Sequence, residues 1–213
     1  MELTKHAHAA VSLTEAGRTV VLDPGTLTPD AHDLMARAEA VLLTHDHVDH
    51  FDRDAVLAAL AAHPQLVVHA PAGVAEQLPG HGSRVRAVAP GDAFDVAGLQ
   101  VAVVGGEHAV IHADLPRTAN VGYLLGGRVY DPGDAYAAPG VPVDTLLLPT
   151  SGPWTKTGEA VDFVRAVSPR RCVSFHDALL NDLGRHLAQT FLGEDGLTRV
   201  PLLVLDVGES VTL

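Results

Sequence analysis

Four side chains able to bind a metal ion stand within six residues of this chain: His45, His47, Asp49 and His50. The residues directly before them, 39–44 (Glu-Ala-Val-Leu-Leu-Thr), have the apolar content of a buried strand. Ligands at the end of a strand are held on a rigid scaffold and point into a common opening. Because imidazole and carboxylate are present without thiolate, the cluster suits zinc, manganese or iron, with positions left for water.

The bulk composition limits the partners that this chain can have. With 213 residues and 47% hydrophobic residues, we expect a single folded domain spanning 1–213. The 26 acidic and 14 basic residues give a formal charge of −12, so we expect neither nucleic acid nor a membrane as partner. No signal peptide and no apolar run of the ~18 residues that span a bilayer are visible, so we expect a cytoplasmic protein. The oligomeric state stays open, with a homo-oligomer allowed.

Strand patterns come in runs in both halves of the chain, with helical patterns between them, which predicts sheets with flanking helices. We expect the last two strands to pair with each other. The predicted strands are 2–5, 9–13, 18–22, 39–44, 66–69, 84–88, 93–96, 99–104, 120–125, 128–130, 145–148, 172–175, 202–205 and 210–213, and the predicted helices are 30–38, 52–60, 71–78, 157–167 and 178–192.

Three more candidate ligands follow predicted strands: His108, Asp134 and His176. Each alone has an ordinary alternative, because a lone histidine at a strand end is usually a surface residue and Pro-Gly-Asp is a common turn. Their joint occurrence with the cluster at 45–50, each after a strand, favours a metal centre.

With these motifs, the opening 3–9 (Leu-Thr-Lys-His-Ala-His-Ala) and the segment 22–25 (Leu-Asp-Pro-Gly), the sequence resembles the metallo-β-lactamase superfamily. Within it, the chain is most similar to the branch of ascorbate-6-phosphate lactonase-like proteins. The resemblance implies an α/β (α+β) fold, a four-layer αββα sandwich of two mixed β-sheets flanked by helices. It also implies two divalent metal ions, most often Zn²⁺, with Mn²⁺ or Fe²⁺ as alternatives. His45, His47 and His108 would hold one ion, Asp49, His50 and His176 the second, and Asp134 would bridge both.

Such a centre provides its own nucleophile. Two cations that share a carboxylate can hold a hydroxide between them, since coordination lowers the pKa of water towards ~7. We therefore expect Asp134, as the bridge, and Asp49, which would orient the hydroxide, to be the catalytic residues. The chain has no Gly-x-Ser-x-Gly motif, and Cys172, on an apolar strand, is expected to serve packing.

Several residues match family positions around the centre. His8 and Asp23 are expected to fix the orientation of ligands, with an exposed strand position as the alternative for His8. Trp154, the only tryptophan, is expected either to form an apolar wall for substrate or to pack at a helix entry. Arg117 and Lys156 are candidates for binding an anionic group of a substrate. His112 and the remaining histidines are not expected to be ligands.

One position departs from the family pattern. Relatives often carry histidine two residues before the Gly-Asp, where this chain has Asp131. A carboxylate there would add negative charge near the metal ions. It would then raise the pKa of bound water or disfavour phosphorylated substrates, which counts against a phosphorylated lactone as substrate.

The leading function is a binuclear hydrolase that cleaves a lactone, ester, amide or phosphodiester in a small molecule. A di-iron redox protein is disfavoured by His47 and by the short chain, because that class usually has glutamate at this position and an added flavin domain. A phosphodiesterase acting as a nuclease needs basic segments, which this acidic chain lacks. A non-catalytic metal-binding or regulatory protein on the same fold is disfavoured because all seven ligand positions are filled.

Overall fold

Two seven-stranded sheets lie at the centre of the computed structural model, which describes residues 1–213. The first sheet contains β1 (Glu2–Lys5), β2 (Val11–Glu15), β3 (Arg18–Leu22), β4 (Ala40–Leu42), β5 (Val67–Pro71), β6 (Val85–Val88) and β14 (Ser210–Thr212). The second contains β7 (Ala93–Val96), β8 (Leu99–Glu107), β9 (Ala119–Leu125), β10 (Val129–Asp131), β11 (Thr145–Pro149), β12 (Arg171–Phe175) and β13 (Leu202–Leu203).

Both sheets are mixed. The first has the order β14-β1-β2-β3-β4-β5-β6 and the second β13-β12-β11-β10-β9-β8-β7. In the first, β3 to β6 run parallel and the pairs from β14 to β3 are antiparallel. In the second, β10 to β13 run parallel and the pairs from β7 to β10 are antiparallel. The carboxyl ends of the parallel strands of each sheet therefore share an edge, where ligands can gather.

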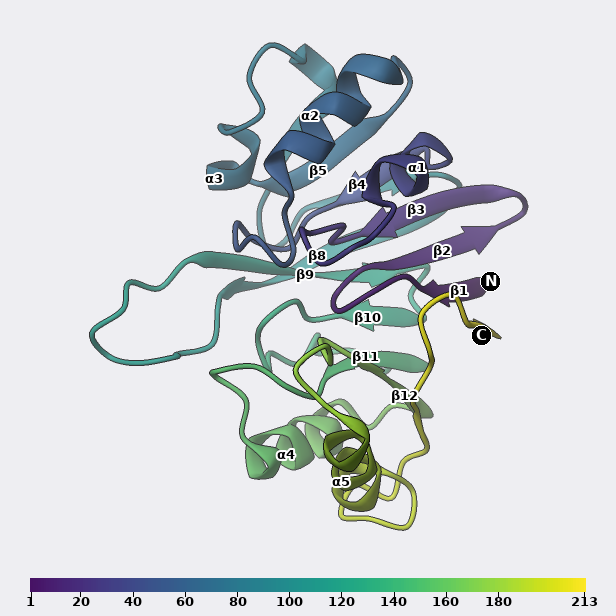
Figure 1. The fold of residues 1–213 in the computed structure, drawn as a ribbon, viewed down its shortest axis with the longest axis vertical. Coiled ribbons are helices and arrows are strands. Elements are labelled where there is room, and N and C mark those ends of the chain that lie inside the picture. The colour runs from purple at the N-terminus through teal and green to yellow at the C-terminus, as the bar shows by residue number, and fades with distance from the viewer.

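The helices cover the two outer sides of this pair of sheets (Figure 1). Helices α1 (Ala31–Ala36), α2 (Arg53–Ala62) and α3 (Ala72–Ala75) lie beyond the first sheet, and α4 (Thr157–Val167) and α5 (Asp182–Leu192) lie beyond the second. A short 3₁₀ turn, Gly82–Arg84, precedes β6. The expected αββα sandwich of two mixed sheets is confirmed. None of the helices is long and apolar enough to cross a membrane.

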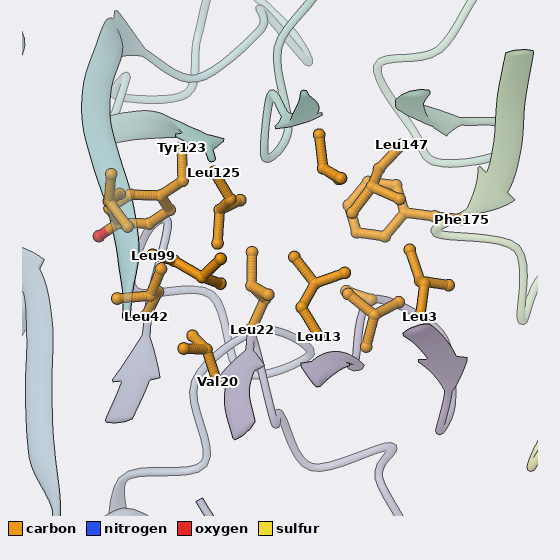
Figure 2. Close-up of a cluster of buried hydrophobic side chains, with 14 of the residues drawn as sticks. Leu3, Leu13, Val20, Leu22, Leu42, Leu99, Tyr123, Leu125, Leu147 and Phe175 are labelled. Carbon is orange, nitrogen blue, oxygen red and sulfur yellow. The ribbon is translucent and has the colours of Figure 1, made fainter. Parts of the chain in front are cut away.

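The core between the sheets is built from aliphatic side chains of both (Figure 2). Leu3 and Leu13 of the first sheet face Leu147 and Phe175 of the second, and all four are fully buried. Leu22 lies opposite Leu125 and is buried as well. Complete burial of one such side chain contributes roughly 1.5–3 kcal/mol. This layer is therefore a rigid base for the strand ends above it.

Local signals explain where the helices begin. The Asp52 carboxylate accepts a hydrogen bond from Ala55 N–H at 3.0 Å and caps α2, as the sequence predicts. Helix α5 begins at Asp182, four residues later than predicted, because Asn181 caps it by accepting from Gly184 N–H at 2.9 Å. Before it the chain turns, with Leu180 N–H donating to Asp177 O.

The predicted pairing of the last two strands is wrong. β13 joins the second sheet parallel to β12, and β14 joins the first sheet antiparallel to β1. Between them the chain turns at 206–209, where Glu209 N–H donates to Asp206 O, and passes from one sheet to the other. Each strand completes an open sheet edge, which the sequence pattern of the two strands alone does not reveal.

Candidate metal centre

The seven predicted ligands meet where strands of both sheets end. The loop after β4 carries His45, His47, Asp49 and His50, while His108 follows β8, Asp134 follows β10 and His176 follows β12. Ligand atoms within 4.8 Å of one another form three groups: His45, His47, His108 and Asp134; His50, Asp134 and His176; and His8, Asp49 and His176.

Asp134 belongs to two of these groups, which is the placement that a bridging carboxylate requires. The first group contains the three histidines predicted for one ion. In the predicted second set, Asp49 groups with His176 and His8 rather than with His50. The assignment of each residue to an ion stays a prediction.

The unpaired atoms of this cluster test whether it fits metal ions. The Nε2 atoms of His45, His50, His108 and His176 and Oδ1 of Asp134 are buried and have no hydrogen-bond partner. His50 Nε2 lies 3.2 Å from Asp134 Oδ1, but without the geometry of a hydrogen bond. Buried polar atoms are nearly always paired, so five unpaired atoms around one point fit bound cations. Nitrogen and oxygen donors suit Zn²⁺, Mn²⁺ or Fe²⁺.

Hydrogen bonds behind the rings turn the free nitrogens towards this point. His108 Nδ1 donates to Ala109 O at 2.6 Å, and His176 Nδ1 donates to Ser151 O at 2.6 Å. Because a carbonyl oxygen only accepts, both Nδ1 atoms carry a proton, and Nε2 is the nitrogen of each ring that can bind a metal ion. This is the usual arrangement of metal-binding histidines.

Asp23 organises the loop after β4, as expected for a residue that orients ligands. Its fully buried carboxylate accepts from Thr44 N–H at 2.8 Å, from Thr44 Oγ1–H at 2.6 Å and from His50 Nδ1–H at 2.6 Å. Since the Thr44 hydroxyl gives its proton to Asp23, it accepts from His45 Nδ1–H at 2.9 Å. Thr44 was not singled out from the sequence, although it stands directly before His45.

His8 is buried at 4% exposure, so the alternative of an exposed strand residue is wrong. Ala178 N–H donates to its Nδ1 at 3.1 Å, so Nε2 carries the proton and donates to Asp49 Oδ2 at 3.2 Å. Burial lowers the pKa of His8, which keeps this ring neutral. His8 therefore holds Asp49 in place, and its own nitrogens are both in use.

Trp154 is part of the centre in a way that neither sequence interpretation foresaw. Its indole Nε1–H donates to Asp134 Oδ2 at 2.8 Å, and its side chain is 6% exposed. Asn120, also unforeseen, accepts from Asp134 N–H at 2.9 Å. A Cβ at Gly133 would lie 2.3 Å from Asn120 Oδ1, so only glycine fits there. Asn120 could have been noticed as an amide within the apolar strand β9.

The groups around Asp134 shift its pKa and those of the neighbouring histidines in different directions. Burial alone would raise the pKa of Asp134, but His50, His108 and His176 hold it well below its usual value. Burial, followed by the neighbouring His50, lowers the pKa of His45 well below its usual value, so this imidazole is neutral. Burial would lower the pKa of His176, but Asp134 and Asp49 raise it to about 9. A metal ion must displace that proton.

Comparison with known proteins places the chain in a family. Residues 2–176 match the family described as Beta-lactamase superfamily domain. The chain belongs to this family. It is 40% identical over 186 residues to the protein Rv0786c of Mycobacterium tuberculosis, covering 84% of this chain and 85% of that one. It is 30% identical over 217 residues to a UPF0173 protein of Pyrococcus abyssi, covering 97% and 96%.

Two further proteins are similar to this chain, one by sequence and one by structure. A protein of Anoxybacillus flavithermus named UPF0173 metal-dependent hydrolase is 34% identical over 97 residues, 44% of this chain and 42% of its own. The solved structure of Igni18, a metallo hydrolase from Ignicoccus hospitalis, has a TM-score of 0.75 at 19% identity and covers 100% of this chain and 97% of that one. The latter likeness supports the fold.

Asp131, the position expected to depart from the family pattern, lies in a buried environment that opposes its charge. It is fully buried, its Oδ1 accepts from Gly133 N–H at 2.9 Å, and its Oδ2 is unpaired. Burial, with a further contribution from Asp23, raises the pKa of Asp131 to about 8. Burial therefore favours the neutral form of this carboxyl, and its effect on phosphorylated substrates stays a prediction.

The other candidates lie outside the three groups of ligand atoms. Arg117 pairs with Glu107 and Lys156 with Glu159, and all four side chains are exposed. The His112 side chain is 67% exposed, in line with its predicted non-ligand role. Cys172 is buried on β12, and burial raises the pKa of its thiol to about 12, which agrees with packing.

Proposed function

We propose that this protein is a metal-dependent hydrolase that uses two divalent ions to cleave a lactone, ester, amide or phosphodiester bond in a small molecule. The observation that carries the proposal is the set of five buried, unpaired ligand atoms around Asp134. When bound, the ions would supply a hydroxide at neutral pH and polarise the bond under attack. Membership of the family and the name of the Anoxybacillus flavithermus relative agree with this function.

The positions of the residues suggest which ion each of them would bind. We assign His45, His47 and His108 to one ion and Asp49, His50 and His176 to the other, with Asp134 between them. Trp154 and Asn120 hold Asp134 through its Oδ2 and its backbone N–H. Zn²⁺ is our first choice of metal, because sites of two or three imidazoles with carboxylate oxygens suit it well.

Asp49 is the carboxylate best placed to orient a water molecule. Its side chain is 30% exposed, whereas those of Asp134, His50 and His176 are almost fully buried. His8 and His176 both contact its Oδ2, which leaves Oδ1 for water. Burial opposes ionisation, but the neighbouring His176 and His8 lower the pKa of Asp49, so it stays a carboxylate. Such a weak base would orient the attacking water by accepting a hydrogen bond, while the metal ions would lower the pKa of that water. No side-chain nucleophile is needed.

Finer assignments belong to the same proposal. The lactonase-like branch remains our expectation for the closest activity, with a small molecule as the substrate and no nucleic acid as partner. We treat 1–213 as one domain, because residues from Leu3 to Leu205 contribute to the core between the sheets.

The test is turnover of a matched panel: a lactone, an aryl ester and a bis-aryl phosphodiester, with the protein loaded with Zn²⁺ or Mn²⁺. We expect at least one substrate to be cleaved, EDTA to abolish the activity and added metal to restore it. The preferred bond would separate acyl from phosphoryl chemistry. Cleavage that survives complete removal of metal would refute the proposed mechanism.

A further inference from the structure

Helix α5 turns its large apolar side chains away from the protein. Leu183, Leu187 and Phe191 follow one another at intervals of four residues and are 64%, 45% and 43% exposed. The face about 100° further round the helix carries Gly184 and Ala188 and ends in Leu192, the one residue of the helix that is buried. This is the reverse of what covering a sheet requires.

The neighbouring helix α4 shows the usual arrangement. Five of its six apolar residues are buried against the second sheet: Ala160, Val161, Phe163, Val164 and Val167. The same sheet is therefore covered by one helix with its apolar face inward and one with its apolar face outward. Burial within the chain does not account for the outward face of α5.

The exposed residues form one band. Leu179, 69% exposed, lies in the turn directly before α5. Leu197, 51% exposed, is held at the end of the helix because its N–H donates to Phe191 O at 2.9 Å. Together the five side chains expose roughly 500 Å² of apolar surface, a size that in a water-facing protein marks an interaction site. We call Leu179, Leu183, Leu187, Phe191 and Leu197 the α5 band.

The surface that covers the α5 band must be apolar, and the two candidates are a lipid surface and a second copy of this chain. A formal charge of −12 opposes docking on an anionic lipid surface. A second copy of the chain can cover the band. With a two-fold axis at Leu187, the two α5 helices pack antiparallel and each band buries the other. A stable dimer buries about 800 Å² per partner, of which the band supplies more than half. Asp182, His186 and Thr190, exposed beside the stripe, would form the polar rim.

We infer that the α5 band is the interface through which two copies of this chain form a two-fold dimer. This inference does not depend on the proposed hydrolase activity, because the band contains no ligand of the metal centre. The interface brings Leu187 of one copy against the same residue of the other. A substitution of Leu187 by a charged residue therefore places two like charges next to each other in the dimer.

Sedimentation equilibrium of the full chain, from about 1 to about 100 μM, tests the inference. We expect the wild type to dimerise, and Leu187→Glu to raise the dissociation constant by about 100-fold or more. The control is Val141→Glu, at a loop position of similar exposure (48%) away from the band, which should leave the constant unchanged. Phe191→Ser tests the end of the band and should weaken the dimer less than Leu187→Glu.

Both α5 variants replace exposed residues, so circular dichroism should show an intact fold. A wild type that stays monomeric throughout the range would overturn the inference. So would a dimer that Leu187→Glu leaves as stable as Val141→Glu does. Flotation of monomeric wild type with neutral phosphatidylcholine vesicles would assign the band to lipid instead and equally overturn it.

Discussion

The two halves of the candidate metal centre are built in different ways. One half comes from a single loop, where His45 to His50 follow β4 and a local network from Asp23 and Thr44 sets the rings. The other half comes from three separate strand ends, after β8, β10 and β12. The first half depends on one buried carboxylate, whereas the second depends on the register of a whole sheet. Substitutions in the two halves should therefore affect metal binding to different extents.

Asp134 serves both halves, so its change should have the largest effect. Asp134→Asn keeps the shape of the side chain but removes the charge that two sets of imidazoles surround. We expect loss of metal from both positions and a fall in kcat/KM of at least about 10³-fold. Metal analysis by mass spectrometry, combined with kinetics, checks this. Asp114→Asn, an exposed carboxyl of the β8–β9 loop, is the control, and equal behaviour of both variants would remove Asp134 from the centre.

A buried ion pair joins the first sheet to the sheet half of the centre. Lys5 of β1 in the first sheet pairs with Asp177, next to His176, and its Nζ donates to Ser174 O at 3.3 Å; both side chains are 1–2% exposed. Lys5→Met leaves Asp177 buried without a counter-charge, which should cost about 3–5 kcal/mol of unfolding free energy. The double variant Lys5→Met/Asp177→Leu should recover most of this loss.

Urea unfolding measures these differences. Lys156→Met, an exposed lysine paired only with Glu159, should change the free energy of unfolding by less than about 0.5 kcal/mol. A Lys5→Met protein as stable as the Lys156→Met protein would show that the two sheets are not held together by this pair.

The loop half is tested through Asp23. Asp23→Asn removes the charge that fixes His50 and, through Thr44, His45, so we expect metal affinity to fall by about 10–100-fold. Competition with a fluorescent zinc chelator measures the affinity. Asp33→Asn, whose side chain is 74% exposed, provides the matched control. An unchanged affinity in Asp23→Asn would mean that the rings are set by something other than this network.

The sheet half is tested through Trp154, with a smaller expected effect. Trp154→Phe removes one hydrogen bond to Asp134 Oδ2 and should lower metal affinity or kcat/KM by about 10-fold. The neighbouring Tyr136 donates to Pro149 O and not to a ligand, so Tyr136→Phe should leave both quantities unchanged. If Trp154→Phe matched Tyr136→Phe, the indole would serve packing alone.

The sequence predicted the loop half more completely than the sheet half, and the reason is physical. Four ligands in six residues after an apolar strand are visible locally, as are the cap of α2 at Asp52 and the inward face of α4. The contact of Trp154 with Asp134 joins residues brought together only by sheet register. The partners of β13 and β14 were missed for the same reason. The outward face of α5 was hidden because its spacing fits a buried helix equally well.

Metal stoichiometry tests the central claim most directly. The protein is stripped with chelator, dialysed against Zn²⁺ and measured for bound metal per chain, beside Asp134→Asn treated in the same way. The account predicts two ions per chain for the wild type and a loss from both positions in the variant. A wild type that binds no ion, or one whose two ions persist in Asp134→Asn, would contradict it.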